Sequence, residues 1–263
     1  MQGIGTAALF GMGILISPEF AKALSEYVSG ATDELPLLNV LPVSLFALTL
    51  MATNILTVLA CRRILHNICF KSAFNYASVN WQPGILALSG GILGAIGMSV
   101  LTDSVEMPDS MQQASLALSR NVWGLLAIVI VGPVTEELLF REAIAGEMLR
   151  RGAGPWVAIL TSALAFSIVH FNFAQGIYAL PLGILLGIIY FKTGNIVLSS
   201  LLHIINNGIV VLQLYIVGEE FVNTSYAELF GGMLIPYIIM TFSIVFCYFF
   251  MCAFWRHYVP FAT

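Results

Sequence analysis

Long apolar stretches constrain the fold of this chain more than any other feature of its sequence. A transmembrane helix needs about 20 mostly apolar residues. Eight stretches approach that length: roughly residues 3–17, 38–60, 83–101, 122–148, 155–171, 174–191, 195–217 and 233–255. Backbone groups in lipid must be hydrogen-bonded within the span, and these runs are too long and continuous for barrel strands. We expect an all-α polytopic membrane protein, a bundle of about eight transmembrane helices forming a single domain over residues 1–263.

The composition agrees with a membrane protein and argues against several other classes. The chain is 59% hydrophobic and only 9% charged, whereas an average soluble domain is roughly 25% charged. A net charge of −4 and the lack of any basic run predict no nucleic-acid partner. The four cysteines have neither zinc-ribbon spacing nor the pattern of a disulfide framework, so we interpret them as packing residues: Cys61, Cys69, Cys247 and Cys252.

The charges between the apolar stretches predict the orientation of the chain. Seven basic residues and no acidic ones follow the second, fourth, sixth and last stretches: Arg62, Arg63, Lys71, Arg150, Arg151, Lys192 and Arg256. The opposite segments hold two basic and ten acidic residues. The positive-inside rule therefore places both termini in the cytoplasm, in a plasma-type cell membrane. The first stretch is short, and a signal-peptide core is its alternative interpretation.

The fourth stretch carries five charged side chains that lipid would not tolerate without partners. A charge at mid-helix costs about 2.5–3.5 kcal/mol on insertion scales. Glu137 and Arg141 are four residues apart, so they share a helix face and are expected to pair. Glu136 points about 100° away and must find a partner on another helix. Glu142 and Glu147 lie closer to the cytoplasmic end, where we expect solvated or snorkelling positions.

Two later stretches carry polar residues that can meet Glu136. His170 ends the fifth stretch, and His203 and Asn207 lie four residues apart on one face of the seventh. Pro133 removes a backbone donor just before Glu136, which loosens the helix where a water or a substrate carbonyl needs access. Along straight helices His203 would lie about 12 Å deep and His170 about 22 Å deep, so a shared site predicts a tilted or unequal bundle.

Three patterns on separate stretches carry a family resemblance. They are, in chain order, Glu136-Glu137-x-x-x-Arg141, Phe166-x-x-x-His170 and His203-x-x-x-Asn207. Together they resemble the CAAX protease and bacteriocin-processing family of intramembrane endopeptidases, also called Abi, which includes the Ras-converting type of CAAX prenyl protease. The resemblance covers about residues 120–215, which we predict to be the catalytic core spans. It implies that Glu137, Arg141 and Phe166 support the site.

The chemistry expected of these residues is hydrolysis of a peptide bond. That reaction requires an activated water, a stabilised oxyanion and a proton for the leaving amine. A buried carboxylate can share a proton with a neighbouring imidazole, so Glu136 with His170 is expected to activate the water. His203 and Asn207, as donors on one face, are expected to hold the oxyanion. The resemblance agrees with this glutamate-dependent mechanism, which requires no cofactor.

A zinc mechanism is the alternative for the same residues. Glu136, His170 and His203 would make the three-ligand open site of a catalytic zinc enzyme. The chain lacks the His-Glu-x-x-His motif of zinc proteases, and Asn207 is better suited as an amide donor than as a ligand. We therefore favour a glutamate protease over a zinc protease.

Other functional classes are less well supported. The nearest match to a serine-protease motif, Ala87-Leu88-Ser89-Gly90, has alanine first, and the aspartates lie between the apolar stretches. A proton-coupled transporter and a non-catalytic immunity or scaffold protein remain further alternatives, although no repeat symmetry is apparent. The expected partners are membrane lipid and a membrane-associated peptide or protein substrate, lipidated or not.

Overall fold

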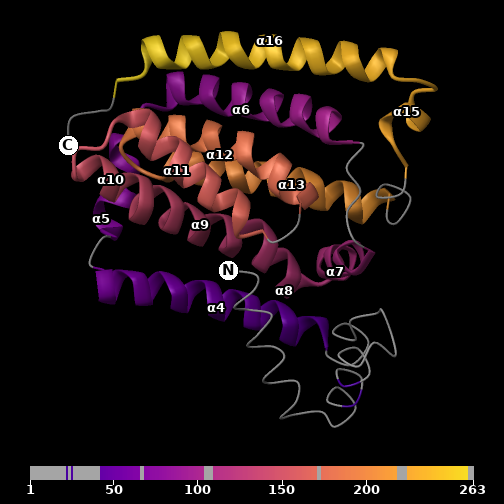
Figure 1. The fold of residues 1–263 in the computed structure, drawn as a ribbon, viewed down its shortest axis with the longest axis horizontal. Coiled ribbons are helices and arrows are strands. Elements are labelled where there is room, and N and C mark those ends of the chain that lie inside the picture. The colour runs from indigo at the N-terminus through magenta and orange to yellow at the C-terminus, as the bar shows by residue number, and fades with distance from the viewer. Residues whose placement is uncertain are drawn as a thin grey trace.

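Helices account for all the regular structure in the segments that can be described. The computed structural model describes residues 22, 25, 42–65, 68–103, 109–170, 173–217 and 224–259, and no strand occurs among them (Figure 1). The helices are α4 (Val43–Leu65), α5 (Phe70–Ala73), η1 (Tyr76–Ser78), α6 (Trp81–Thr102), α7 (Asp109–Ser119), α8 (Val122–Leu125), η2 (Leu126–Val131), α9 (Gly132–Glu137), η3 (Leu138–Gly146), α10 (Glu147–Arg150), α11 (Pro155–Ile168), α12 (Phe173–Thr193), α13 (Val197–Val217), α15 (Tyr226–Leu229) and α16 (Leu234–His257).

Six of the predicted spans form helices long and apolar enough to cross a membrane. They cover Val43–Ile64, Trp81–Thr102, Val122–Arg150, Phe173–Thr193, Val197–Ile216 and Leu234–His257. The fifth predicted span forms only the 14-residue helix α11, about 21 Å long. The first predicted span, 3–17, lies outside the described residues. The all-α polytopic fold is thus confirmed, with an unequal bundle in which α11 is shorter than a full span.

The fourth span is one long helix whose hydrogen-bond register changes along its length. It runs from Val122 to Arg150 and contains two π-helical segments, η2 and η3, on either side of α9. In a π turn the N–H of residue i bonds the carbonyl of residue i−5, as Gly132 does to Ala127. Each π turn rotates the following side chains relative to an ideal α-helix, so a period of 3.6 residues does not hold over the whole length of this span.

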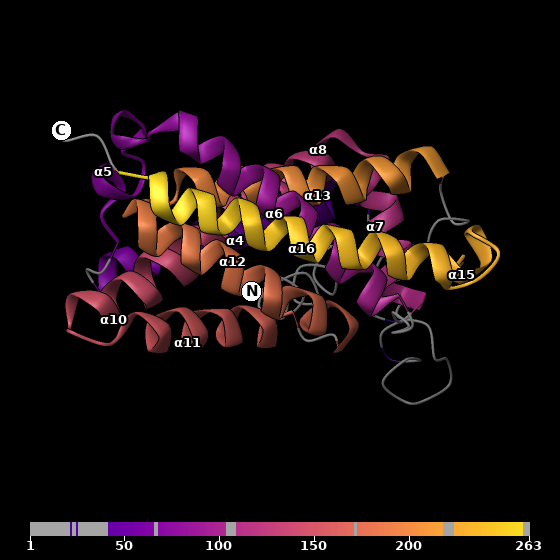
Figure 2. The same cartoon turned by 90° about the horizontal axis from the view of Figure 1, so that it is seen from above.

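The helices stack in layers with the fourth span in the interior (Figure 1). α16 packs on α6, and α6 in turn packs on α12 and α13. α13 and α11 contact the fourth span through α9, η2 and η3, and α4 covers the opposite side of that span. Figure 2, seen from above, shows α16 running along α6 across the top of the molecule. The charged residues of the fourth span therefore lie between helices rather than against lipid.

Small residues in α6, among them Gly90 and Gly94, let α6 and α16 approach closely. A Cβ on Gly94 would lie 3.0 Å from the sulfur of Cys247 in α16, and one on Gly90 would lie 3.0 Å from Cβ of Phe250. Cys247 is buried there, as expected of a packing residue, whereas Cys69 is exposed and does not pack. Gly90 and Gly94, four residues apart, thus form a close helix contact of the kind that small residues allow.

A second close contact joins α11 to α12 in an antiparallel pair. A Cβ on Gly183 would lie 3.2 Å from Cα of Ala163, and one on Gly187 would lie 3.0 Å from the side chain of Ile159. The close fit holds α11 against α12 although α11 is short. It also places the end of α11, where Phe166 and His170 lie, beside the middle of the bundle.

A tight turn brings α13 back against α12. Gly194 has a φ of 71°, a left-handed conformation that a residue without a Cβ adopts readily. The Asn195 side chain then accepts a hydrogen bond from the backbone N–H of Val197 at 3.0 Å, which caps the start of α13. This turn sets the position of α13 and so the depth of His203.

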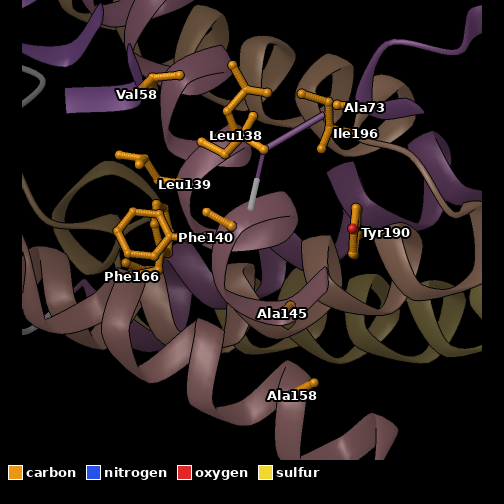
Figure 3. Close-up of a cluster of buried hydrophobic side chains, with 13 residues drawn as sticks. Val58, Ala73, Leu138, Leu139, Phe140, Ala145, Ala158, Phe166, Tyr190 and Ile196 are labelled. Atoms are coloured by element: carbon orange, nitrogen blue, oxygen red, sulfur yellow. The ribbon is translucent and has the colours of Figure 1, made fainter. Parts of the chain in front are cut away.

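A cluster of 13 buried apolar residues surrounds η3 (Figure 3). It draws Val58 from α4, Phe140 from η3, Phe166 from α11 and Tyr190 from α12. The rings of Phe140 and Phe166 meet edge to face with centroids 5.3 Å apart. Because Phe166 is only 1% exposed, this packing fixes the position of its ring. The polar residues described next pack against that ring.

Candidate active site

The predicted pair of Glu137 and Arg141 is present and completely buried. Arg141 Nε donates to Glu137 Oε2 at 3.1 Å, and both side chains are 0% exposed. Arg141 Nη1 also donates to Ser162 Oγ at 2.8 Å, and that hydroxyl donates to the Phe140 carbonyl at 2.6 Å. The guanidinium lies 5.3 Å from the centroid of the Phe166 ring. Arg141 therefore ties the fourth span to α11.

Glu136 lies on a different face of the fourth span and meets α13. Its Oε2 is 3.7 Å from His203 Nε2, and its side chain is 19% exposed. The other imidazole nitrogen, Nδ1, faces Glu137 Oε1 at 3.4 Å without the alignment of a hydrogen bond. His203, 3% exposed, thus sits between two carboxylates from consecutive residues.

These four side chains form one electrostatic unit. Glu137 and Arg141 offset each other's charge, which leaves Glu136 and His203 as the remaining pair. The unit carries no net charge when one proton is shared between Glu136 and His203. An uncompensated charge is costly in a low-dielectric bundle, so the arrangement suits a proton that moves between the two groups.

Phe166 brings both histidines to the same place. Its ring meets that of His170 edge to face at 4.8 Å and that of His203 edge to face at 5.5 Å. The two histidines therefore lie on one side of the bundle, despite the different depths that straight helices predict. His170 lies just beyond the end of α11, in a turn where its backbone N–H bonds the Ser167 carbonyl.

The His170 ring is oriented by its own turn. Nδ1 lies 2.7 Å from the Phe166 carbonyl, which can only accept, so Nδ1 carries the proton. In the neutral ring Nε2 is then the unprotonated nitrogen, able to act as a base. In the described part of the chain the carboxylate of Glu136 comes within ion-pair distance of His203 but not of His170.

Asn207 is held at the same face of α13 as His203 by a chain of hydrogen bonds. Its Nδ2 donates to the Ile128 carbonyl at 2.9 Å, and its Oδ1 accepts from Asn206 Nδ2 at 3.2 Å. Asn206 Oδ1 accepts from the Tyr178 hydroxyl at 2.7 Å. The sequence motifs do not include Tyr178 and Asn206. The only feature of the sequence that points to Asn206 is that it places a second amide next to Asn207 in an apolar span.

The expectation that Glu142 is solvated or snorkels is wrong. Glu142 is not solvated but 2% exposed, accepting from the Tyr190 hydroxyl at 2.8 Å and from Arg150 Nη1 at 3.2 Å. The absence of a Cβ at Gly146 makes room for the Tyr190 hydroxyl. Glu147 does lie at the end of the span, paired with Arg150 at 3.1 Å. Glu142 escapes solvation because Tyr190 reaches it from α12, a contact between helices that its depth in the span cannot reveal.

The arrangement does not match the ligand set of a zinc site. Across the segments described above, no three His, Cys, Asp or Glu side chains converge on a point where they could hold a metal ion. Glu136 and His203 lie 3.7 Å apart, and His170 keeps only Nε2 free because its Nδ1 bonds the Phe166 carbonyl. We derive no step through a metal.

Comparison with known proteins agrees with the motifs. A family model described as type II CAAX prenyl endopeptidase Rce1-like matches residues 118–209. That range contains every residue of the three motifs. Residues 118–209 are thus similar to the Rce1-like type II CAAX prenyl endopeptidases. Within this range α9 supplies Glu136, the turn after α11 supplies His170, and α13 supplies His203 and Asn207, while α4, α6 and α16 pack around it from outside.

Two curated relatives each match part of this chain. UPF0177 protein YxdF of Lactococcus lactis is 30% identical over 129 residues, which is 48% of this chain and 64% of that protein. The membrane-embedded CAAX protease MroQ of Staphylococcus aureus is 28% identical over 90 residues, 32% of this chain and 36% of MroQ. The chain thus covers less than two thirds of either relative. No solved structure matches it.

Proposed function

We propose that this chain is an intramembrane endopeptidase that hydrolyses peptide bonds of membrane-associated peptides or proteins. The observation that carries the proposal is the placement of Glu136, a partly exposed carboxylate beside His203, against a fully buried Glu137–Arg141 pair. The name of MroQ as a CAAX protease supports it. A purely structural cluster would not need one carboxylate left accessible at 19% exposure.

In the proposed reaction Glu136, assisted by His170, takes a proton from a water molecule. The water oxygen attacks the scissile carbonyl carbon, and the carbonyl oxygen becomes an oxyanion that His203 and Asn207 stabilise as donors. The proton held by Glu136 then passes to the amide nitrogen as the carbon–nitrogen bond breaks. The products are a carboxylic acid, which keeps the second proton of the water, and a free amine, and Glu136 returns to its starting state.

Glu137 and Arg141 have a positioning role in this proposal. Glu137 faces His203 Nδ1, so it favours the ring orientation that turns Nε2 toward Glu136. Arg141 holds Glu137 in place and offsets its charge. Phe166 contacts both histidines and keeps them near each other.

The proposed mechanism uses no metal. The described residues support this, because among them no third His, Cys, Asp or Glu side chain joins Glu136 and His203 where a metal ion could be held. Zinc remains the alternative outcome of the experiment below, since the same residue types are used by catalytic zinc enzymes.

The test is a digest of a peptide library, prenylated and unprenylated, by the purified protein in lipid vesicles, read by mass spectrometry. Glu136→Gln should abolish cleavage, while Glu147→Gln, at the end of the same span, should leave it unchanged. Cleavage should survive a strong chelator. Loss on chelation with recovery on adding zinc would establish the zinc alternative, and the absence of cleavage of either peptide class would contradict a protease and favour a transporter or scaffold.

A further inference from the structure

The Ile128 carbonyl is a hydrogen-bond acceptor that the fourth span leaves open. In η2 the N–H of Gly132 bonds Ala127, five residues earlier. In the same register the next donor, for Ile128, would be residue 133, which is a proline and has no N–H. The π turn and Pro133 together therefore expose the Ile128 carbonyl toward the neighbouring helix. Asn207 Nδ2 from α13 donates to it at 2.9 Å.

This bond determines which way the Asn207 amide faces. Because a carbonyl only accepts, the amide must turn its nitrogen to Ile128 and its oxygen to Asn206. Asn206, 6% exposed, is turned in the same sense, since its oxygen receives the Tyr178 hydroxyl and its nitrogen donates to Asn207. Reversing either amide would set two oxygens or two N–H groups against each other.

One N–H of Asn207 remains after these bonds are made. Nδ2 carries two hydrogens, and the Ile128 carbonyl takes one. Asn207 shares a helix face with His203, so the second hydrogen belongs to the side of α13 on which Glu136 lies. A donor that is already oriented costs no reorganisation when negative charge develops, which is the condition for effective oxyanion stabilisation.

We propose that Tyr178, Asn206 and Pro133 are positioning residues that hold Asn207 as an oriented oxyanion donor. Tyr178 and Asn206 fix the orientation of the Asn207 side-chain amide through its oxygen. Pro133 leaves the Ile128 carbonyl free to accept from the nitrogen of the same amide. The inference rests on the proposed function, in which Asn207 stabilises the oxyanion. It assigns a catalytic purpose to the irregular register of the fourth span.

The first test is Tyr178→Phe, measured by kcat and KM on a quenched fluorescent peptide taken from the cleaved members of the library. We expect kcat to fall roughly 2- to 10-fold, the worth of one net hydrogen bond. KM should not change, because the oxyanion exists only in the transition state. The matched control is Tyr190→Phe, which removes a hydroxyl from the same helix and from another buried acceptor, Glu142. It should lower thermal stability without changing kcat.

The second test is Pro133→Ala, which restores an N–H that can bond the Ile128 carbonyl in place of Asn207. This variant should unfold at a higher temperature, because a helix gains a backbone hydrogen bond, yet its kcat should fall. A proline with only a structural role predicts unchanged kcat. On an Asn207→Ala background, neither Tyr178→Phe nor Pro133→Ala should lower kcat further.

The outcomes separate this inference from the proposed function. Asn207→Ala should itself lower kcat about 10²–10³-fold. If it retains wild-type kcat, the oxyanion role of Asn207 fails. Two results would overturn the positioning inference alone, provided that Asn207→Ala loses activity. One is a kcat of Tyr178→Phe equal to that of Tyr190→Phe. The other is a further fall in kcat, as large as in the wild-type protein, when Tyr178→Phe or Pro133→Ala is added to Asn207→Ala.

Discussion

A pair of buried, oppositely charged residues lies beside the proposed catalytic groups. Glu137 and Arg141 are both inaccessible to solvent, and each offsets the charge of the other. Such a pair adds little net stability compared with apolar residues of the same size, but removing one partner leaves an uncompensated charge. The pair is therefore best explained by what Glu137 faces, which is Nδ1 of His203.

We expect Arg141→Ala to destabilise the protein by about 3–5 kcal/mol, because it leaves Glu137 as a lone buried charge. It also removes the bond to Ser162. The measurement is thermal unfolding in detergent. A double variant, Glu137→Gln with Arg141→Met, has no buried charge and should regain most of the lost stability while remaining inactive. An unfolding temperature unchanged in Arg141→Ala would contradict the pairing.

At the level of elements, the close approach of α11 to α12 sets the position in the bundle of the C-terminal end of α11. Gly183 lies against the backbone of Ala163 and the ring of Phe166, with a Cβ position 3.2 Å from both. Phe166 in turn touches both histidines. A helix contact outside the reacting groups thus sets the geometry of the site.

Gly183→Leu should force α11 away from α12, displacing Phe166. We expect a loss of about 1–3 kcal/mol from overpacking together with a marked fall in peptide cleavage. Gly154→Leu is the control, since Gly154 begins α11 but has no atom within 4 Å of its Cβ position. Both variants are compared by thermal unfolding and by cleavage rate. Equal behaviour of the two would show that the contact does not position the site.

At the scale of the whole molecule, all the site residues lie within residues 118–209, which the Rce1-like family model matches, and α16 lies at the periphery. The connection between α4 and α6 carries exposed polar and basic residues, among them Lys71 and the free thiol Cys69. The distribution of charge predicts that this connection faces the cytoplasm. We propose that orientation for the chain, in a plasma-type membrane.

Cys69 offers a direct test of the orientation. Hydrogen bonding from Ser72 lowers the pKa of the Cys69 thiol below its usual value, so more of it is thiolate at neutral pH and labelling should extend to lower pH. A membrane-impermeant maleimide should label Cys69 in permeabilised cells but not in intact ones. Cys69→Ser should abolish the fast labelling, and Ser72→Ala should shift its pH dependence upward. Fast labelling of Cys69 in intact cells would reverse the proposed orientation.

The sequence alone predicts the helical class, most of the spans and the residues of the three motifs. It succeeds because the cost of exposing polar backbone in lipid forces apolar runs into helices, and because a period of 3.6 residues places Glu137 and Arg141 on one face. The pairing of these two residues is a local consequence of their spacing, so it follows from sequence.

Only the tertiary structure decides which helices meet. It brings His203 to Glu136, turns Glu142 to Tyr190 instead of solvent, and links Tyr178 through Asn206 to Asn207. These contacts join helices far apart in the chain, and the π turns of the fourth span change the register that a regular helix would predict. Spacing along one helix fixes the angle of a side chain on that helix. Packing between helices determines what the side chain faces, because it depends on the shapes of all the helices together.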